Sequence, residues 1–120
     1  MSMEFRGLLP WKRDVGIVDV HTERGVVDLF NDSTLVSVCI QPGARSLLLR
    51  FDTPMGGLVV TLGRIAGMRA EGAVEVLSTM DFWQFDYFEE SAELPETIVV
   101  YFTEGELAVE AGLVATEWLD

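Results

Sequence analysis

"TLVSVCIQPGARSLLLRFDTPMGGLVVTL", residues Thr34 to Leu62, contains three short apolar segments separated by turn residues. Within each segment every second residue is large and apolar, which is the pattern of a strand with one buried face. The three sets are Val36, Val38 and Ile40, then Leu47, Leu49 and Phe51, and then Leu58, Val60 and Leu62. Proline and glycine in "QPGA" and "DTPMGG" favour tight turns between the segments. This stretch predicts an antiparallel meander.

The same kind of pattern continues toward the C-terminus. Thr97 to Thr103 holds five consecutive strand formers, Ile98 to Phe102, and such a run indicates burial on both faces. We predict a mostly β fold, with α+β as the alternative class: a single domain over residues 1–120, arranged as an antiparallel meander sheet, barrel or sandwich, with at most two short helices. The predicted strands are Thr34 to Ile40, Ser46 to Phe51, Leu58 to Leu62, Trp83 to Tyr87, Thr97 to Thr103, Leu107 to Val109 and Leu113 to Trp118. A further short strand is predicted around Ile65 to Arg69, and the helix candidates are Glu23 to Asp32 and Ala73 to Met80.

The charge of the chain is strongly negative and unevenly distributed. Eight basic residues stand against 20 acidic ones, for a net charge of −12. Up to Arg69 the basic residues outnumber the acidic ones by one, whereas the remaining 51 residues carry 13 carboxylates and no basic side chain. A field of this sign repels nucleic acid and anionic lipid, and it attracts basic proteins. We therefore expect a basic protein partner and neither nucleic-acid nor membrane binding. The alternative is that the acidity serves only solubility.

The acidic part opens on "DFWQFDYFEE", Asp81 to Glu90, which combines five aromatic rings with four carboxylates. As a strand, it would place Trp83, Phe85 and Tyr87 on one face, and Phe82, Gln84, Asp86 and Phe88 on the other. We interpret the first face as core and the second, with the glutamates that follow, as a docking surface. Exposed rings beside carboxylates can hold arginine and lysine side chains by ion pairs and cation–π contacts. The predicted partner-binding residues are Asp81, Phe82, Asp86, Phe88, Glu89, Glu90, Glu93 and Glu96.

A second hypothesis comes from a different functional class. The sheet would enclose an apolar pocket for a small ligand, with Trp83, Tyr87 and Trp118 as its aromatic lining. The position of the rings and carboxylates separates the two hypotheses. A convex acidic patch with exposed rings favours the docking module, and an enclosed aromatic cavity favours the ligand-binding domain.

The inventory for catalysis is small. The chain has one histidine, His21, and one cysteine, Cys39. We interpret His21 as structural or solvated, and Cys39, which lies inside an apolar strand, as a small buried hydrophobe. No phosphate loop, dinucleotide fingerprint, calcium loop or metal-ligand spacing occurs in the sequence. We predict a non-enzymatic protein with no cofactor and no metal site.

Location and self-association follow from the cysteine count and the strand pattern. A single cysteine and an N-terminal apolar run too short for a signal peptide or a membrane span predict a reducing, cytoplasmic location. Short apolar strands such as "SLLLRF" and "TIVVYF" leave sheet edges with little charge to prevent pairing, which favours a homodimer. Its interface should not be centred on Glu89 to Glu96, because like charges would meet there.

One segment also resembles a known family. Leu29 to Gly72, which includes "LFNDSTLVSVCI" and "SLLLRF", is similar to small bacterial β-rich domains related to immunity proteins of polymorphic toxin systems. That family has an "FHD" signature followed by apolar strands. Phe30 and Asp32 match the signature, and Asn31 stands where the family has histidine. The resemblance implies a non-enzymatic protein that neutralises a toxin or otherwise binds a partner, and it assigns no functional residue.

Overall fold

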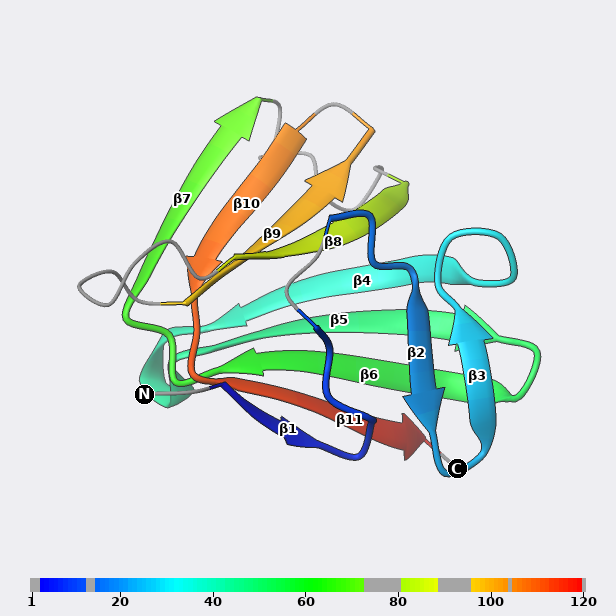
Figure 1. Ribbon diagram of the computed structural model, residues 1–120. Helices are drawn as coiled ribbons and strands as arrows, with labels where there is room; N and C mark the ends of the chain where they lie inside the picture. Colours follow the sequence, from blue (N-terminus) through cyan, green and yellow to red (C-terminus); the bar gives the residue numbers. More distant parts are fainter. Residues whose placement is uncertain (1–2, 13–14, 73–80, 89–95, 104, 120) are drawn as a thin grey trace.

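The computed structural model describes residues 3–12, 15–72, 81–88, 96–103 and 105–119 and confirms a mostly β fold. Two sheets and a hairpin make up these residues (Figure 1). The five-stranded sheet has the order β1 (Glu4–Arg6), β11 (Leu113–Leu119), β6 (Gly56–Gly63), β5 (Ser46–Thr53) and β4 (Thr34–Gln41). The four-stranded sheet has the order β7 (Gly67–Gly72), β10 (Gly105–Glu110), β9 (Thr97–Phe102) and β8 (Phe82–Phe88). The hairpin pairs β2 (Asp19–Thr22) with β3 (Gly25–Asp28).

The core lies between the two sheets. On β5 and β6 the predicted apolar sets are fully buried, as their alternation indicates: Leu47, Leu49 and Phe51, with Leu58, Val60 and Leu62. The facing side chains of the four-stranded sheet are also buried: Phe82, Phe85, Tyr87, Ile98, Val100, Phe102, Leu107 and Val109. The predicted strands on β4 to β6 and β8 to β11 are confirmed, with ends that differ by at most two residues. The strand predicted around Ile65 to Arg69 is displaced to Gly67–Gly72.

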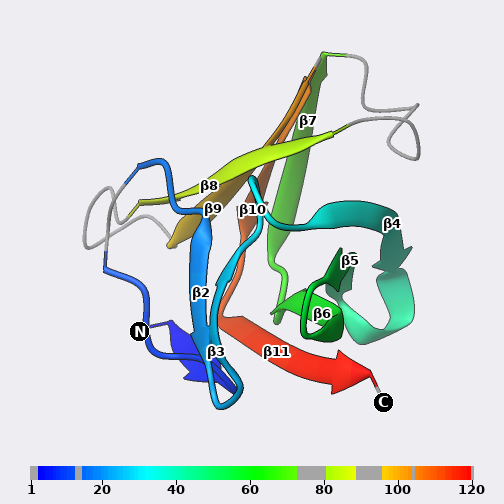
Figure 2. The ribbon, with the colours of Figure 1, turned by 90° about the vertical axis from the view of Figure 1, so that its right-hand side faces the viewer.

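The β2–β3 hairpin closes one side of the space between the sheets (Figure 2). Val20, Val27 and Leu29 bury their side chains in the common core. The segment before β2 joins the four-stranded sheet, because Ile17 and Phe85 exchange backbone hydrogen bonds of 2.7 and 2.8 Å. The N-terminal segment, the hairpin and β8 are thus held together.

Three short strands, β1 to β3, were not predicted from the sequence, and one strand pairing differs from the prediction. β1 runs parallel to β11, with Glu4 opposite Leu113, so the prediction of a wholly antiparallel fold is wrong for this pair. The helix predicted over Glu23 to Asp32 is also wrong, because its first half forms the β2–β3 turn and β3. Gly25 adopts a φ of 122°, which suits this turn and would strain any other residue. The second helix candidate, residues 73–80, lies outside the described residues.

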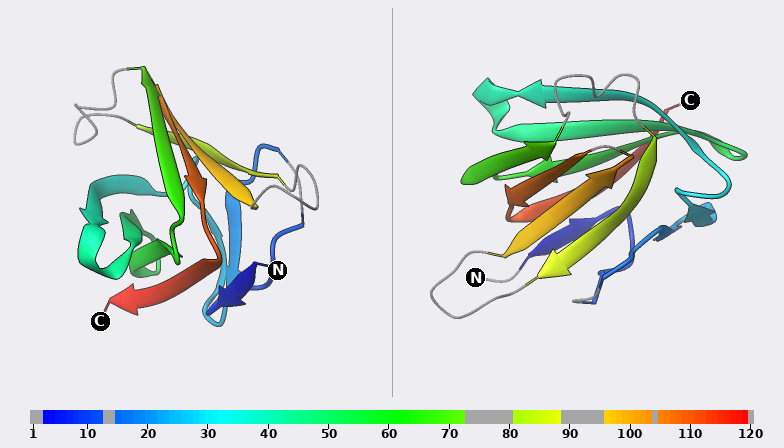
Figure 3. Two further views of the ribbon diagram at one scale, coloured as in Figure 1. Left: turned by 90° about the vertical axis from the view of Figure 1, so that its left-hand side faces the viewer. Right: turned by 90° about the horizontal axis from the view of Figure 1, so that it is seen from above.

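Strand β4 forms a rim of the five-stranded sheet (Figure 3). Cys39 on this strand is exposed, so its prediction as a buried hydrophobe is wrong. It lies opposite Leu48 of β5 and therefore points away from the core face, which carries Leu47 and Leu49. In the part of the chain that the structure describes, the helical content is one 3-10 turn, Pro42–Ala44, and no helix has the length and apolar character of a membrane span.

Candidate interaction surface

A β-bulge in β8 decides which aromatic rings reach the surface. Phe82 lies opposite Phe102 of β9, but Gln84 lies opposite the next residue back, Tyr101, so Trp83 is an extra residue. The bulge turns Phe82 into the core, where its ring is 5.3 Å from Phe51 and its exposed fraction is 4%. Trp83 instead is 51% exposed. The predicted division of the rings between two faces is therefore wrong for this pair: Phe82 is not a surface residue, and Trp83 is.

The outer face of the four-stranded sheet is the face opposite its buried side chains. Tyr101 lies between Gln84 of β8 and Glu106 of β10, and Glu106 in turn lies opposite Glu71 of β7. In the next row on this face, Val99 separates Asp86 from Ala108. The described ionisable carboxylates on the outer face are Glu71, Asp86, Glu106 and Glu110, and the basic residue among them is Arg69. The outer face is therefore acidic, as the charge distribution of the sequence suggests.

Asp86 is a buried residue of this face with a structural role. Only 5% of the residue is exposed, and its Oδ1 accepts hydrogen bonds from the Gly16 backbone N–H at 2.8 Å and from Gln84 Nε2 at 2.9 Å. The Tyr101 hydroxyl interacts with the same carboxylate, which contributes to its raised pKa. The prediction of Asp86 as an exposed docking carboxylate is corrected accordingly. This side chain holds the segment before β2 against β8, because a buried carboxylate needs such donors.

This environment raises the pKa of the Tyr101 hydroxyl. Burial, the hydrogen bond to Asp86 and the charges of Asp86 and Glu106 raise the pKa of Tyr101 to about 12. Each of these causes disfavours the phenolate. Tyr101 thus stays a neutral hydrogen-bond donor on the outer face at physiological pH.

Glu96 is the second predicted docking carboxylate that is buried, with 7% of the residue exposed. Its Oε2 accepts hydrogen bonds from the Tyr87 hydroxyl at 2.5 Å and from the Met3 backbone N–H at 2.8 Å. Of the other predicted partner-binding residues, Asp81 is exposed and Phe88 is half-buried. Glu89, Glu90 and Glu93 lie outside the described residues.

An aromatic cleft lies at the β8 edge of the outer face. It has a volume of about 260 Å³ and is lined by Trp83, Gln84, Tyr101, Phe102 and Thr103. Phe30, itself 47% exposed, lies next to Trp83 of this cleft, with 6.1 Å between the two ring centroids. The carboxylate of Asp81 immediately precedes this strand and is exposed.

The turn that carries Phe30 is organised by Asp28. The Asp28 carboxylate accepts hydrogen bonds from the backbone N–H groups of Phe30 at 2.9 Å and Asn31 at 2.8 Å, and from Asn31 Nδ2 at 2.9 Å. The bond from the Asn31 backbone is the main reason that the pKa of Asp28 lies below its usual value. A contact role for Phe30 was not predicted from the sequence. The sequence signal for this turn is Asp28, because an aspartate side chain commonly accepts the backbone N–H two residues further on.

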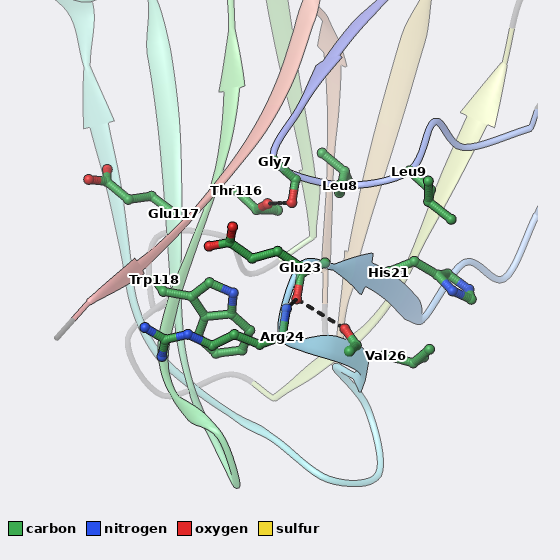
Figure 4. A pocket seen from close by; sticks show the side chains of 12 residues that line it. Gly7, Leu8, Leu9, His21, Glu23, Arg24, Val26, Thr116, Glu117 and Trp118 are labelled. Atoms are coloured by element: carbon green, nitrogen blue, oxygen red, sulfur yellow. Dashed lines mark hydrogen bonds between the residues drawn. The ribbon is translucent and has the colours of Figure 1, made fainter.

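The aromatic pocket of the second hypothesis does not form. Trp83 lies on the outer face, Tyr87 is buried in the core, and Trp118 lines a separate open groove of about 660 Å³ (Figure 4). In this groove the Arg24 guanidinium stacks 4.8 Å from the centre of the Trp118 ring. His21, Glu23 and Glu117 also line it, so the groove is polar as well as apolar.

The described residues hold no group of three or more histidine, cysteine or acidic side chains that could bind a metal ion. His21 is exposed on β2 of the hairpin, and Cys39 is exposed on β4 of the five-stranded sheet, so the two side chains lie on different sheets. No family model, no curated protein and no solved structure matches this chain.

Proposed function

We propose that the protein is a non-enzymatic interaction module that binds a basic protein partner on the outer face of its four-stranded sheet. The observation that carries the proposal is the pair of exposed rings, Phe30 and Trp83, at the border of an acidic face. Neighbouring exposed apolar side chains that form a continuous patch can mark a contact surface. Their acidic surroundings favour a partner rich in arginine and lysine.

The physical basis is a combination of two contacts. An arginine or lysine side chain laid over Trp83 would gain a cation–π contact, worth about 0.5–1 kcal/mol at an exposed site. The same cation would be attracted by Asp81 and by Glu106, which adjoins Tyr101. Electrostatic attraction of this kind raises the association rate more than the intrinsic affinity.

An immunity or inhibitor role is the biological form of this proposal. Such a protein acts by binding alone, so it requires a complementary surface and no catalytic group. The resemblance of Leu29 to Gly72 to immunity-related domains supports this form. That segment contributes Phe30 to the proposed contact surface.

The ligand-binding hypothesis is retained for one place only. The open groove beside Trp118 has a volume of about 660 Å³, within the range of small-molecule sites. Its lining combines apolar residues such as Leu9 and Trp118 with charged ones such as Glu23, so it suits a ligand with both apolar and polar parts. A set of fluorescent apolar probes tests it directly: probe fluorescence that rises with wild-type protein and not with Trp118→Ala would support this second function.

The docking proposal is tested with a defined basic peptide, twelve residues of alternating arginine and lysine, titrated into 15N-labelled protein. We expect shifts of the Trp83 indole N–H and of the Tyr101 and Glu106 amides, and binding that weakens as salt rises. The matched variants are Glu106→Gln on the outer face and Glu117→Gln on β11 of the other sheet. Each removes one glutamate charge, from half-buried Glu106 or from exposed Glu117, but only the first should weaken binding.

The aromatic contact has its own matched pair. Trp83→Ala should weaken peptide binding several-fold, whereas Leu9→Ala, which removes a 63% exposed apolar side chain elsewhere, should leave it unchanged. Equal effects of the two glutamine variants, together with an unaltered affinity for Trp83→Ala, would show that the peptide responds only to net charge and would overturn the proposal.

A further inference from the structure

Strand β4 is an edge strand without the usual protection. Among the described residues it pairs with one neighbour, β5. Its eight residues, "TLVSVCIQ", include no charged residue and no proline. Edge strands of soluble proteins usually carry such residues, or a bulge, because an open row of backbone N–H and C=O groups can pair with another chain. β4 has a bulge between Leu35 and Ser37, but from Ser37 to Gln41 it pairs regularly with β5.

The side chains of this regular part are divided by face. Val38 and Ile40 lie opposite Leu49 and Leu47 of β5, so they share the core face of the sheet. Even so, Ile40 is 47% exposed. The core face of the sheet therefore ends in an apolar side chain at the β4 rim. The described part of the chain leaves about half of this side chain, Ile40, uncovered. Ser37, Cys39 and Gln41 share the opposite face.

We propose that a second copy of this chain pairs with β4, antiparallel, about a two-fold axis at Cys39. Cys39 is the midpoint of the regular segment, and directly opposed residues of an antiparallel pair lie on the same face. Val38 would then lie opposite Ile40 of the second copy, and Ile40 opposite its Val38, on the core face. Ser37 would lie opposite Gln41 on the other face. Apolar side chains meet apolar ones and polar meet polar, so the strand is complementary to itself.

The charge distribution favours a second copy over a basic partner at this edge. β4 has no carboxylate to attract a basic chain, and the stretch from Thr34 to Gly63 contains only Arg45, Arg50 and Asp52 as charged residues. The acidic excess of the chain lies after Arg69. That part of the chain includes strands β8, β9 and β10 of the four-stranded sheet. Two copies of this strongly acidic protein therefore meet with the least repulsion along β4, and their five-stranded sheets become one continuous sheet.

Cys39 provides a probe of this arrangement, because it is the single cysteine of the chain. Directly opposed residues in an antiparallel pair have Cα atoms about 4.5–5.5 Å apart. This spacing suits a disulfide or a short bifunctional maleimide. We expect the full-length protein, treated with a mild oxidant or with the maleimide, to give a covalent dimer on non-reducing gels. The control places the cysteine on the hairpin instead: Cys39→Ser with Val26→Cys, at a position that is 54% exposed, should stay monomeric on the gel.

A second variant pair measures the association itself. Ile40→Lys would bring two positive charges into the pairing, whereas Val26→Lys places the same group on β3. Sedimentation velocity over a concentration series should show a dimer for the wild type and for Val26→Lys, and at least a tenfold weaker dimer for Ile40→Lys. A wild-type monomer at high micromolar concentration would overturn the proposal. So would a dimer that neither cross-links through Cys39 nor responds to Ile40→Lys.

Discussion

The Tyr87 hydroxyl donates a 2.5 Å hydrogen bond to Oε2 of Glu96, and the same oxygen accepts the backbone N–H of Met3 at 2.8 Å. Tyr87 belongs to the four-stranded sheet, whereas Met3 immediately precedes β1 of the five-stranded sheet. A single buried carboxylate thereby joins the two sheets near the start of the chain. Glu96 was predicted from the sequence to belong to a docking surface, but the structure gives it this internal role.

Replacement of Glu96 tests that role. Glu96→Ala would leave the Tyr87 hydroxyl and the Met3 N–H buried without this acceptor, and we expect the free energy of unfolding to fall by about 2–4 kcal/mol. Urea denaturation of the variant provides the measurement. Asp81→Ala, which removes an exposed carboxylate, serves as the control and should change stability by less than about 0.5 kcal/mol. Equal stability of the two variants would contradict the structural role.

The bulge at Trp83 leads to a second prediction. Phe82→Ala would leave a cavity beside Phe51 and Phe85, and we expect it to lower the free energy of unfolding by about 3–5 kcal/mol. Trp83→Ala removes an exposed ring and should cost about 1 kcal/mol or less. Without the bulge the order would be reversed, because regular alternation places Trp83 inside. Denaturant titrations of the two variants therefore identify the register of β8.

The titration of Tyr101 is the third prediction. Its pKa is raised to about 12, so the ultraviolet absorbance of the phenolate should rise in that range, and Tyr101→Phe should remove one tyrosine's share of this rise. Asp86→Asn removes a charge and should move the pKa of Tyr101 down toward its usual value of 10. A raised pKa in the folded state favours the protonated form. This contribution to stability is complete below pH 10 and is lost as the pH rises through about 12. Burial is the largest cause of the rise, so part of it should remain, but a pKa of Tyr101 that Asp86→Asn leaves unchanged would contradict the contribution of Asp86.

Much of the fold was predictable because its central strands alternate regularly. β5 and β6 bury every second residue, so their faces follow directly from the sequence. The short strands β1 to β3 were missed because segments of three or four residues have too little periodicity to recognise. β1 moreover lies parallel to β11, a pairing between the two ends of the described chain that no local pattern encodes.

The candidate site was harder to predict, for two physical reasons. One extra residue in β8 exchanges the faces of Phe82 and Trp83, and the sequence of a bulge differs little from that of a regular strand. The exposure of a carboxylate also depends on donors that come from elsewhere in the chain. Asp86 is covered through Gly16 and Glu96 through Met3, which are 70 and 93 residues away in sequence. The acidity of the outer face, by contrast, agrees with the excess of carboxylates that follows Arg69 in the sequence.

The last prediction concerns the close approach of Gly7 to β11. Gly7 has a φ of 82°, and a Cβ atom placed there would lie 2.5 Å from the carbonyl oxygen of Thr116 and 2.8 Å from its Oγ1. The Thr116 hydroxyl donates a 2.7 Å hydrogen bond to the Gly7 carbonyl, so the two segments cannot separate without losing this contact. We expect Gly7→Ala to lower the free energy of unfolding by at least about 1–3 kcal/mol, through backbone strain and the displacement of β11. Gly43→Ala is the matched control, because a Cβ atom at Gly43 meets nothing within 4 Å. This control should leave stability unchanged or raise it by about 0.4–1 kcal/mol, since alanine restricts the unfolded chain. Urea denaturation of both variants gives the comparison, and equal midpoints would show that the N-terminal segment does not pack on β11 in this way.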